Sequence, residues 1–228
     1  MPSFSSYKNP AHAVDIVVFG YEGDSLSVLL LNRRDEPFKN GWTLPGAFLQ
    51  MEEAFKDACA RVLEMKLGIS KVYLEQLYTF DAPDRDPRGR VISTAYYALI
   101  NPARVKIVAG SMANDVQWFP VKKLPALGFD HKKIYKQALQ RLQSKILYFP
   151  VGFELLDDAF TMPELHRLYE CILATEIDRR NFSKKILASE FVILTGARRE
   201  AGKSRPPELY RFNKKLRQNS FQLNIQTS

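Results

Sequence analysis

Short apolar runs separated by polar turn residues dominate the first part of the chain. Val14–Gly20 and Leu26–Leu31 are rich in Val and Leu, and Glu22-Gly23-Asp24 lies between them, so the pair predicts a β-hairpin. Two longer runs rich in Tyr, Val and Ile and one shorter run also predict strands: Val72–Phe80, Arg90–Ile100 and Asp115–Phe119.

A helical pattern follows the strands. The segment His131–Leu147 places apolar residues at Ile134, Leu139, Leu142 and Ile146 with basic residues between them, which predicts an amphipathic helix. A second helix is expected over Glu53–Leu67. The order of strands and helices predicts an α/β sandwich, in which helices flank a mixed sheet.

The pattern changes near residue 148, where Tyr148–Gly152 contains Pro and Gly breakers. Thr161-Met162-Pro163-Glu164 is a capping box that opens a helix through about Leu173, and Asp178 is the expected N-cap of a helix through about Ala188. Strands are predicted at Phe191–Thr195 and Glu208–Phe212, with a basic loop between them. Helix, turn, helix, strand, loop, strand is the order of a winged helix-turn-helix. We therefore expect two domains, residues 1–148 and 149–228.

Composition limits the class of protein. The 228 residues are 46% hydrophobic, which is ordinary for a globular protein with a packed core. Cys59 and Cys171 lie far apart, so the sequence predicts neither a disulfide framework nor a zinc cluster. The chain shows no signal-peptide pattern and no apolar run of about 20 residues that would span a membrane. A cytoplasmic protein is expected.

Positive charge is concentrated near the C-terminus. Residues 179–217 contain twelve basic and three acidic residues, so this segment carries more net charge than the +8 of the whole chain. A solvated basic face would have the same composition. Because the basic residues coincide with the expected second helix and wing, we favour binding to double-stranded DNA. The candidate contacts are Arg179, Arg180, Asn181, Ser183, Lys184, Lys185, Arg198, Arg199, Lys203 and Arg205.

The segment Ala47–Ile69 resembles the Nudix box, G-x5-E-x7-R-E-U-x-E-E-x-G-U, where U is aliphatic. Ala47 stands in place of the first glycine, whereas Glu53, Arg61, Leu63, Gly68 and Ile69 match. Nudix hydrolases hold magnesium on the glutamates of this box, and those glutamates are absent. The three positions are occupied by Val62, Met65 and Lys66.

Hard divalent cations need oxygen ligands, which Val and Met do not supply, and Lys adds a repelling charge. The remaining carboxylates nearby are expected to be a solvated helix face: Glu52, Glu53, Asp57 and Glu64. We therefore expect no catalytic residue, no bound metal and no cofactor. A scaffold that has lost hydrolysis but kept ligand binding is the favoured interpretation.

The two halves together resemble the NrtR-type, Nudix-related transcriptional regulators of bacteria. The resemblance covers roughly residues 10 to 213. It implies a Nudix effector-binding domain, a winged helix-turn-helix and a homodimer that grips a palindromic operator and releases it when a small effector binds. The similar passages are the degenerate box, Asp84–Ser93 leading into Ala95–Leu99, and Asp178–Phe182.

Members of this family differ in effector. Some respond to ADP-ribose, and others resemble sugar regulators, including an arabinose-responsive branch. The amino-acid sequence around residues 80–100 and 121–131 is more similar to the sugar-responsive type. Both a pentose and ADP-ribose are therefore candidates. One hypothesis is that Lys66 replaces the metal as a fixed positive charge. The candidate effector contacts are Trp42, Phe48, Arg61, Lys66, Asp81, Arg85, Asp86, Arg88 and Arg90.

Several of these residues have structural alternatives. Arg61 is as well explained by an ion pair with Glu53 or Asp57 as by ligand contact. Trp42 and Phe48 suit either stacking on a ligand or the core. Asp81, Asp84 and Asp86 suit either hydrogen bonds to sugar hydroxyls or turns. Asp130-His131 suits either the cap of a helix or the pocket, and the cap is favoured.

Two other functions compete with the regulator. One is an active Nudix hydrolase of ADP-ribose or a related nucleoside diphosphate, with displaced metal ligands. The other is an RNA-binding module, which the sequence disfavours because no aromatic motif of the sheet-stacking kind lies near the basic cluster.

Overall fold

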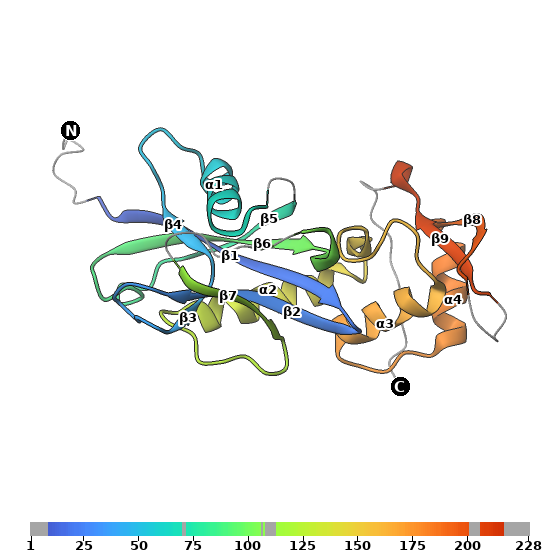
Figure 1. The fold of residues 1–228 in the computed structure, drawn as a ribbon. Helices are drawn as coiled ribbons and strands as arrows, with labels where there is room; N and C mark the ends of the chain where they lie inside the picture. The colour runs from blue at the N-terminus through green and yellow to red at the C-terminus, as the bar shows by residue number, and fades with distance from the viewer. Residues whose placement is uncertain (1–8, 70–71, 106, 108–112, 201–205, 217–228) are drawn as a thin grey trace. The chain divides into compact units, whose positions relative to one another are not determined.

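The computed structural model describes residues 9–69, 72–105, 107, 113–200 and 206–216, which fall into two compact units (Figure 1). The first unit takes in Met1–Phe19, Val28–Ala98 and Val105–Ala138. The second takes in Gly20–Ser27, Leu99–Arg104 and Leu139–Ser228. The division falls within a helix, and the domain boundary expected between residues 148 and 149 remains a prediction. Among the described residues, no helix is long and apolar enough to cross a membrane.

The first unit is built on a sheet whose strand order is β3-β2-β1-β6-β5, with β4 paired to β1 and β7 paired to β2. The central strand β1 is buried over most of its length because it carries the apolar run that predicted it. The strands are β1 (Ala11–Glu22), β2 (Ser25–Arg33), β3 (Trp42–Thr43), β4 (Gly46–Phe48), β5 (Tyr73–Phe80), β6 (Val91–Ile100) and β7 (Ala113–Pro120). The predicted hairpin and the three later strands are confirmed, whereas β3 and β4 had no sequence signal.

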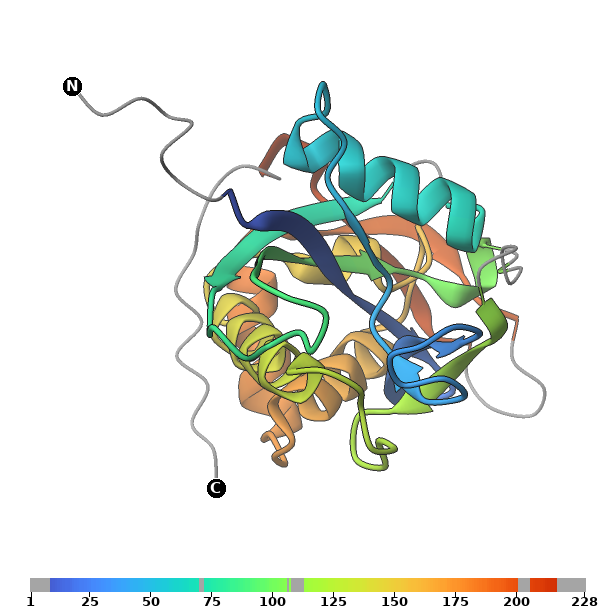
Figure 2. The same cartoon turned by 90° about the vertical axis from the view of Figure 1, so that its left-hand side faces the viewer.

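Two helices flank this sheet, α1 (Phe55–Leu67) and α2 (His131–Lys145), as the turned view in Figure 2 shows. Helix α1 ends at Gly68, whose backbone is left-handed with φ of 70°, a conformation that glycine adopts without steric cost. The inward face of α1 is apolar and buried at Ala58, Cys59, Val62, Leu63 and Leu67. The predicted α/β class is confirmed.

The second unit contains α3 (Met162–Leu173), α4 (Arg179–Ala188), and an antiparallel hairpin of β8 (Val192–Arg198) and β9 (Glu208–Phe212). The capping box at α3 forms as predicted, because Thr161 accepts from the Glu164 amide and the Glu164 carboxylate accepts from the Thr161 amide. Each such cap contributes about 1 kcal/mol. A core of aromatic rings holds the helices and the hairpin together: Phe160, Tyr169, Phe182 and Phe212. The predicted winged helix-turn-helix is confirmed.

The turn between β1 and β2 and the end of β6 belong to this second unit. Arg167 on α3 pairs with Asp24 in the turn at 2.9 Å, and Asn101 after β6 donates to Asp157 at 2.9 Å. The residues of β1, β2 and β6 that lie in these two segments are therefore counted with the second unit.

Candidate functional site

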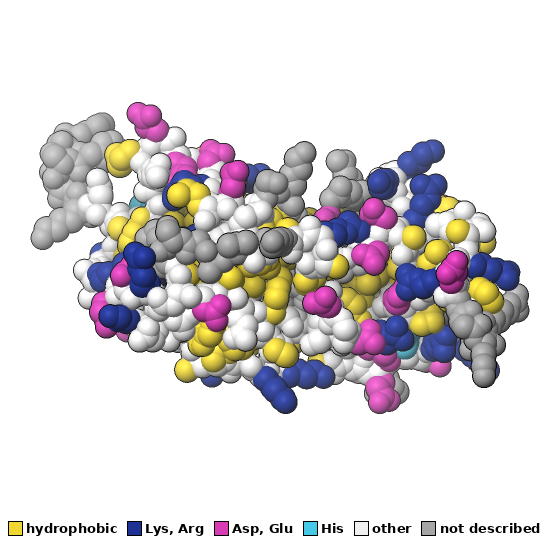
Figure 3. Space-filling view, viewed as in Figure 1, with side chains coloured by type: hydrophobic (Ala, Val, Ile, Leu, Met, Phe, Trp, Pro, Cys, Tyr) yellow, Lys and Arg dark blue, Asp and Glu magenta, His cyan; other side chains and the backbone are white. Residues whose placement is uncertain are grey.

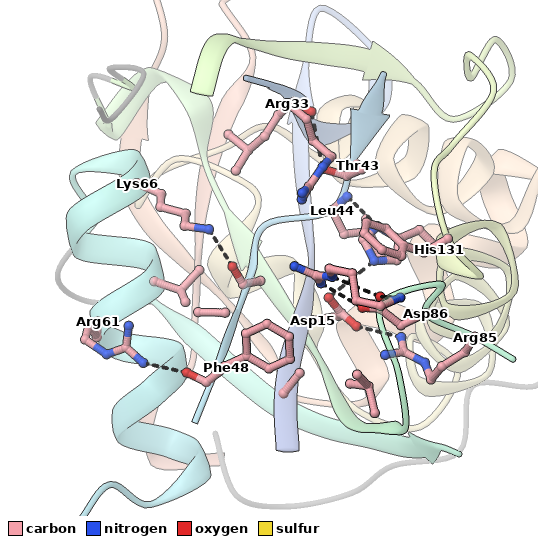
Figure 4. A pocket seen from close by; sticks show the side chains of 18 of the residues that line it. Asp15, Arg33, Thr43, Leu44, Phe48, Arg61, Lys66, Arg85, Asp86 and His131 are labelled. Carbon is pink, nitrogen blue, oxygen red and sulfur yellow. Dashed lines mark hydrogen bonds and ion pairs between the residues drawn. The ribbon is translucent and has the colours of Figure 1, made fainter. Parts of the chain in front are cut away.

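A cavity of about 360 Å³ opens in the first unit (Figure 4). Strands β1 and β2, the segment 43–48, helix α1 and the loop before β6 all contribute side chains to it. Its polar lining comprises Asp15, Asn32, Arg33, Thr43, Arg61, Lys66, Arg85, Asp86, Arg88 and His131. Apolar lining is provided by residues that include Leu31, Phe48, Val62, Met65 and Phe129. A hollow with apolar walls and a few converging polar groups is typical of a small-molecule site.

A buried charge network forms one wall of the cavity, and Asp15 on β1 is at its centre. The Asp15 carboxylate accepts from Arg85 Nη2 at 2.9 Å and from Ser93 Oγ at 2.7 Å, and it lies 3.3 Å from His131 Nε2. Arg85 also donates to both oxygens of Asp130, at 2.8 and 3.1 Å. Burial by itself would raise the pKa of Asp15, but His131, Arg85 and Ser93 together lower it well below its usual range.

His131 links this network to the cavity floor. Its Nδ1 accepts from the Leu44 amide at 2.9 Å, so the ring proton lies on Nε2, facing Asp15. The sequence suggested a helix-capping role for Asp130-His131. In the structure, the Asp130 carboxylate instead accepts hydrogen bonds from Arg85, and His131 lines the cavity.

Arg88 and two phenylalanines lie together on another part of the lining. The guanidinium lies 5.0 Å from the Phe48 ring centroid and 5.7 Å from that of Phe129. Asp86 holds it in a bidentate ion pair, with bonds of 2.7 and 2.9 Å. These flat surfaces suit stacking with an aromatic ring of a ligand.

The face of α1 that enters the cavity carries Val62, Met65 and Lys66. The Lys66 Nζ donates to the Gly46 carbonyl at 2.5 Å. Glu53 is engaged by Arg61, and none of the other carboxylates on or near α1 lines the cavity. Within the part of the chain that the structure describes, no three His, Cys, Asp or Glu side chains are grouped to hold a metal. The residues present therefore do not fit the divalent cation of Nudix hydrolases.

The structure brings six of the nine candidate effector contacts to the cavity: Phe48, Arg61, Lys66, Arg85, Asp86 and Arg88. The other three do not line it. Trp42 packs its ring edge against Phe119 with centroids 4.7 Å apart, and Arg90 is exposed and donates to the Asp81 carbonyl. Arg61 pairs with Glu53 at 2.6 Å and also lines the cavity, so the ion-pair alternative holds beside a place in the site. Phe48 lines the cavity and is 42% exposed, so the core alternative is wrong for this residue.

Five polar lining residues are absent from the effector contacts predicted from the sequence: Asp15, Asn32, Arg33, Thr43 and His131. Of these, only His131 was an alternative pocket residue. One signal was available for Asp15, since it interrupts the apolar run Ala13–Phe19 in a strand with no other charge there. An unpaired charge in such a strand is costly, so it indicates a partner from elsewhere in the fold.

The second unit presents a basic surface over α4 and the β8–β9 hairpin (Figure 3). Phe182 and Ile186 are buried, and the opposite face of α4 exposes Arg180 and Lys184. Arg179 is also exposed, whereas Asn181, Ser183 and Lys185 are half-buried. Asp178 caps the helix by accepting from the Asn181 amide at 2.7 Å, and Ser183 donates to the Arg179 carbonyl.

The wing residues differ in how they are held. Arg198 lies 3.9 Å from Glu208, a loose and exposed pair, whereas Arg199 pairs with Glu164 at the start of α3 and donates to the Ala159 carbonyl. Lys203 and Arg205 lie outside the described residues. Arg199 thus also fastens the base of the wing to α3.

Comparison with known proteins places both units. Residues 9–140 match the NUDIX domain family, and residues 152–212 match the NrtR DNA-binding winged helix domain. The ADPR responsive transcriptional repressor NtrR of Acinetobacter baylyi is 36% identical over 212 residues, which is 91% of this chain and 84% of that protein.

Two further proteins are similar. The crystal structure of Shewanella oneidensis NrtR complexed with a 27mer DNA superposes with a TM-score of 0.81 at 32% identity, covering 94% of this chain and 98% of that one. The ADP-ribose pyrophosphatase of Methanocaldococcus jannaschii is 34% identical over 140 residues, 61% of this chain and 79% of that protein. Both domains match the family models, and the two regulators cover more than nine-tenths of the chain. This chain therefore belongs to the NrtR-type family of Nudix transcriptional regulators.

Proposed function

We propose that this protein is a transcriptional repressor that binds operator DNA through α4 and the wing and releases it when ADP-ribose enters the Nudix cavity. One observation carries the proposal. The three residues that replace the metal-binding glutamates, Val62, Met65 and Lys66, all line the cavity. The site thus keeps a ligand-sized space while lacking the groups that hold a catalytic metal.

Three features of the cavity support ADP-ribose as the effector. A volume of about 360 Å³ lies within the usual range for small-molecule sites. Its cationic lining suits a diphosphate, and the flat Phe48, Arg88 and Phe129 surfaces suit an adenine ring. The Acinetobacter relative is named as ADPR responsive, ADPR being ADP-ribose. A pentose such as arabinose is the other effector expected from the sequence. It is uncharged and therefore forms no ion pair with the cationic side chains.

Fluorescence anisotropy on labelled DNA from upstream of its own gene tests the proposal. We expect tight binding that weakens steeply as salt rises, because phosphate contacts release counterions. ADP-ribose should release the DNA, whereas arabinose and other pentoses at the same concentration should not. Release by a pentose and not by ADP-ribose would transfer the effector role to sugars. No specific DNA binding in any condition would reject the regulator.

The proposal includes a homodimer acting in the cytoplasm, with residues 1–148 binding the effector and 149–228 binding DNA. Two recognition helices related by a two-fold axis would read half-sites about 34 Å apart. The same anisotropy titration, run at high DNA concentration, should saturate at two chains per operator. Saturation at one chain would contradict the dimer and leave the effector assay unaffected.

A hydrolase is the second candidate, and the similarity to the Methanocaldococcus ADP-ribose pyrophosphatase favours it. Cleavage of ADP-ribose would release AMP and ribose 5-phosphate. We expect no AMP above the no-enzyme control in magnesium, because α1 offers the cavity no oxygen ligand at the three box positions. Chromatographic detection of AMP checks this, with EDTA as the matched condition. AMP released in magnesium and suppressed by EDTA would establish the hydrolase.

A further inference from the structure

Five cationic side chains line the cavity, and most of them already have carboxylate partners. Each of these pairs is short, between 2.6 and 2.9 Å, so the positive charge is largely neutralised within the protein. Three cations are held in this way: Arg61 by Glu53, Arg85 by Asp15 and Asp130, and Arg88 by Asp86.

Arg33 and Lys66 are different. Arg33 Nε donates to the Pro37 carbonyl at 2.7 Å and Lys66 Nζ donates to the Gly46 carbonyl, and neither is ion-paired with a carboxylate among the described residues. Figure 4 shows Lys66 reaching in from α1 and Arg33 from β2 toward the same hollow. Two cations with only neutral partners therefore face one cavity.

The charges around Arg33 and Lys66 indicate that a bound anion would stabilise this pair. Burial lowers the pKa of Lys66 and the positive charge of Arg33 lowers it further, while Asp15 offsets part of this effect. Burial and the neighbouring Arg88 lower the pKa of Arg33 in the same way, and Asp86, Asp35 and Glu36 offset only part of it. Half-buried like charges destabilise each other unless an opposite charge lies between them. The other three cations, Arg61, Arg85 and Arg88, each have a carboxylate in direct contact.

We propose that Arg33 and Lys66 form a subsite that takes the diphosphate of the effector directly, with no divalent cation between protein and phosphate. This inference rests on the proposed function, because it describes how the same cavity holds its ligand. Each phosphate of a diphosphate diester carries a negative charge at neutral pH, so the two side chains can neutralise the two phosphates. A lysine binds phosphate as a point charge, and an arginine adds a planar pair of donors.

The position of Lys66 explains why no metal is needed. A hard cation bound beside α1 would seek oxygen ligands. The Gly46 carbonyl, an oxygen at the cavity edge, already accepts from the Lys66 ammonium. Val62 and Met65, on the same helix face, offer no oxygen. The Lys66 ammonium, which is part of the protein, therefore supplies the positive charge that a bound metal would bring.

Calorimetric titration of the full-length protein with ADP-ribose tests the subsite. We expect the affinity to be the same in magnesium and in EDTA. Lys66→Met keeps the length of the side chain and removes its charge, and Arg33→Gln removes the other cation. Each should weaken ADP-ribose binding by about tenfold or more, as expected for a lost charge-assisted hydrogen bond. Adenosine, which has no phosphate, should bind all three proteins equally.

Lys56→Met is the matched control, because Lys56 lies on α1, is exposed and does not line the cavity. It should leave ADP-ribose affinity unchanged. Operator binding without effector should persist in every variant, which establishes that each one folds. Binding of ADP-ribose that requires magnesium would overturn the inference, as would Lys66→Met and Arg33→Gln variants that bind within twofold of the parent protein.

Inorganic pyrophosphate separates this inference from the proposed effector. Suppose that the parent protein binds pyrophosphate but not ADP-ribose, and that Lys66→Met loses pyrophosphate. The subsite then stands and the effector assignment fails. If the parent protein binds neither compound in magnesium or EDTA, the subsite is rejected as well.

Discussion

The double substitution Arg180→Ala and Lys184→Ala is expected to abolish specific operator binding. Both side chains lie on the exposed face of α4, opposite the buried Phe182 and Ile186, so their removal costs no core packing. An arginine that reads a guanine contributes about 1–3 kcal/mol, and each lost phosphate contact reduces the salt slope by about one. Anisotropy titrations at several salt concentrations measure both quantities.

Single variants and a distant control sharpen this result. The Arg180→Ala variant should bind the operator about tenfold more weakly or worse, and it should discriminate less against mutated operators. Lys132→Ala removes one exposed cation from α2 and should change neither affinity nor salt slope beyond error. The assignment of α4 as the recognition helix would fail if the double variant bound the operator as tightly as the Lys132→Ala control.

Asp15→Ala is expected to be among the most destabilising single substitutions in the first unit. It would leave Arg85, whose side chain is only 3% exposed, without one of its two carboxylates, and it would remove the acceptor of Ser93 and the partner of His131. Breaking a buried ion pair in this way costs about 3–5 kcal/mol. For a chain of this size the melting temperature should fall by roughly 6–20 °C, as calorimetry would measure.

The pH dependence of stability follows from the same carboxylate. The folded state lowers the pKa of Asp15, so its contribution is fully present above the ordinary value near 4 and is lost as pH falls. The difference in unfolding free energy between the parent protein and Asp15→Asn should therefore be constant near neutrality and shrink as the pH falls below about 4.

Asp35→Ala is the control for both measurements. Asp35 lies 3.8 Å from Arg34, and both side chains are more than half exposed, so the pair is worth about 0–1 kcal/mol. It should shift the melting temperature little at any pH. An Asp15→Ala protein as stable as Asp35→Ala would show that the buried network is not what holds the cavity wall.

The elements of this protein could be predicted from local sequence because their signals are local. The alternation of apolar runs and turns set the β1–β2 hairpin, and Thr161 with Glu164 set the start of α3. Asp178 likewise set the start of α4. The strands β3 and β4 were missed, since segments of two and three residues form only through pairing with β2 and β1.

The sequence by itself determined the loss of the metal-binding glutamates and the concentration of basic charge near α4, because residue identity and spacing suffice for both. Only the tertiary structure decided which cations are already neutralised. Arg85 meets Asp15 across 70 positions and Arg199 meets Glu164 across 35. Among the described residues, Arg33 and Lys66 instead donate their hydrogen bonds to backbone carbonyls. The physical reason is that Coulomb energy depends on distance and burial in space, and the sheet register fixes these, not the order of residues along the chain.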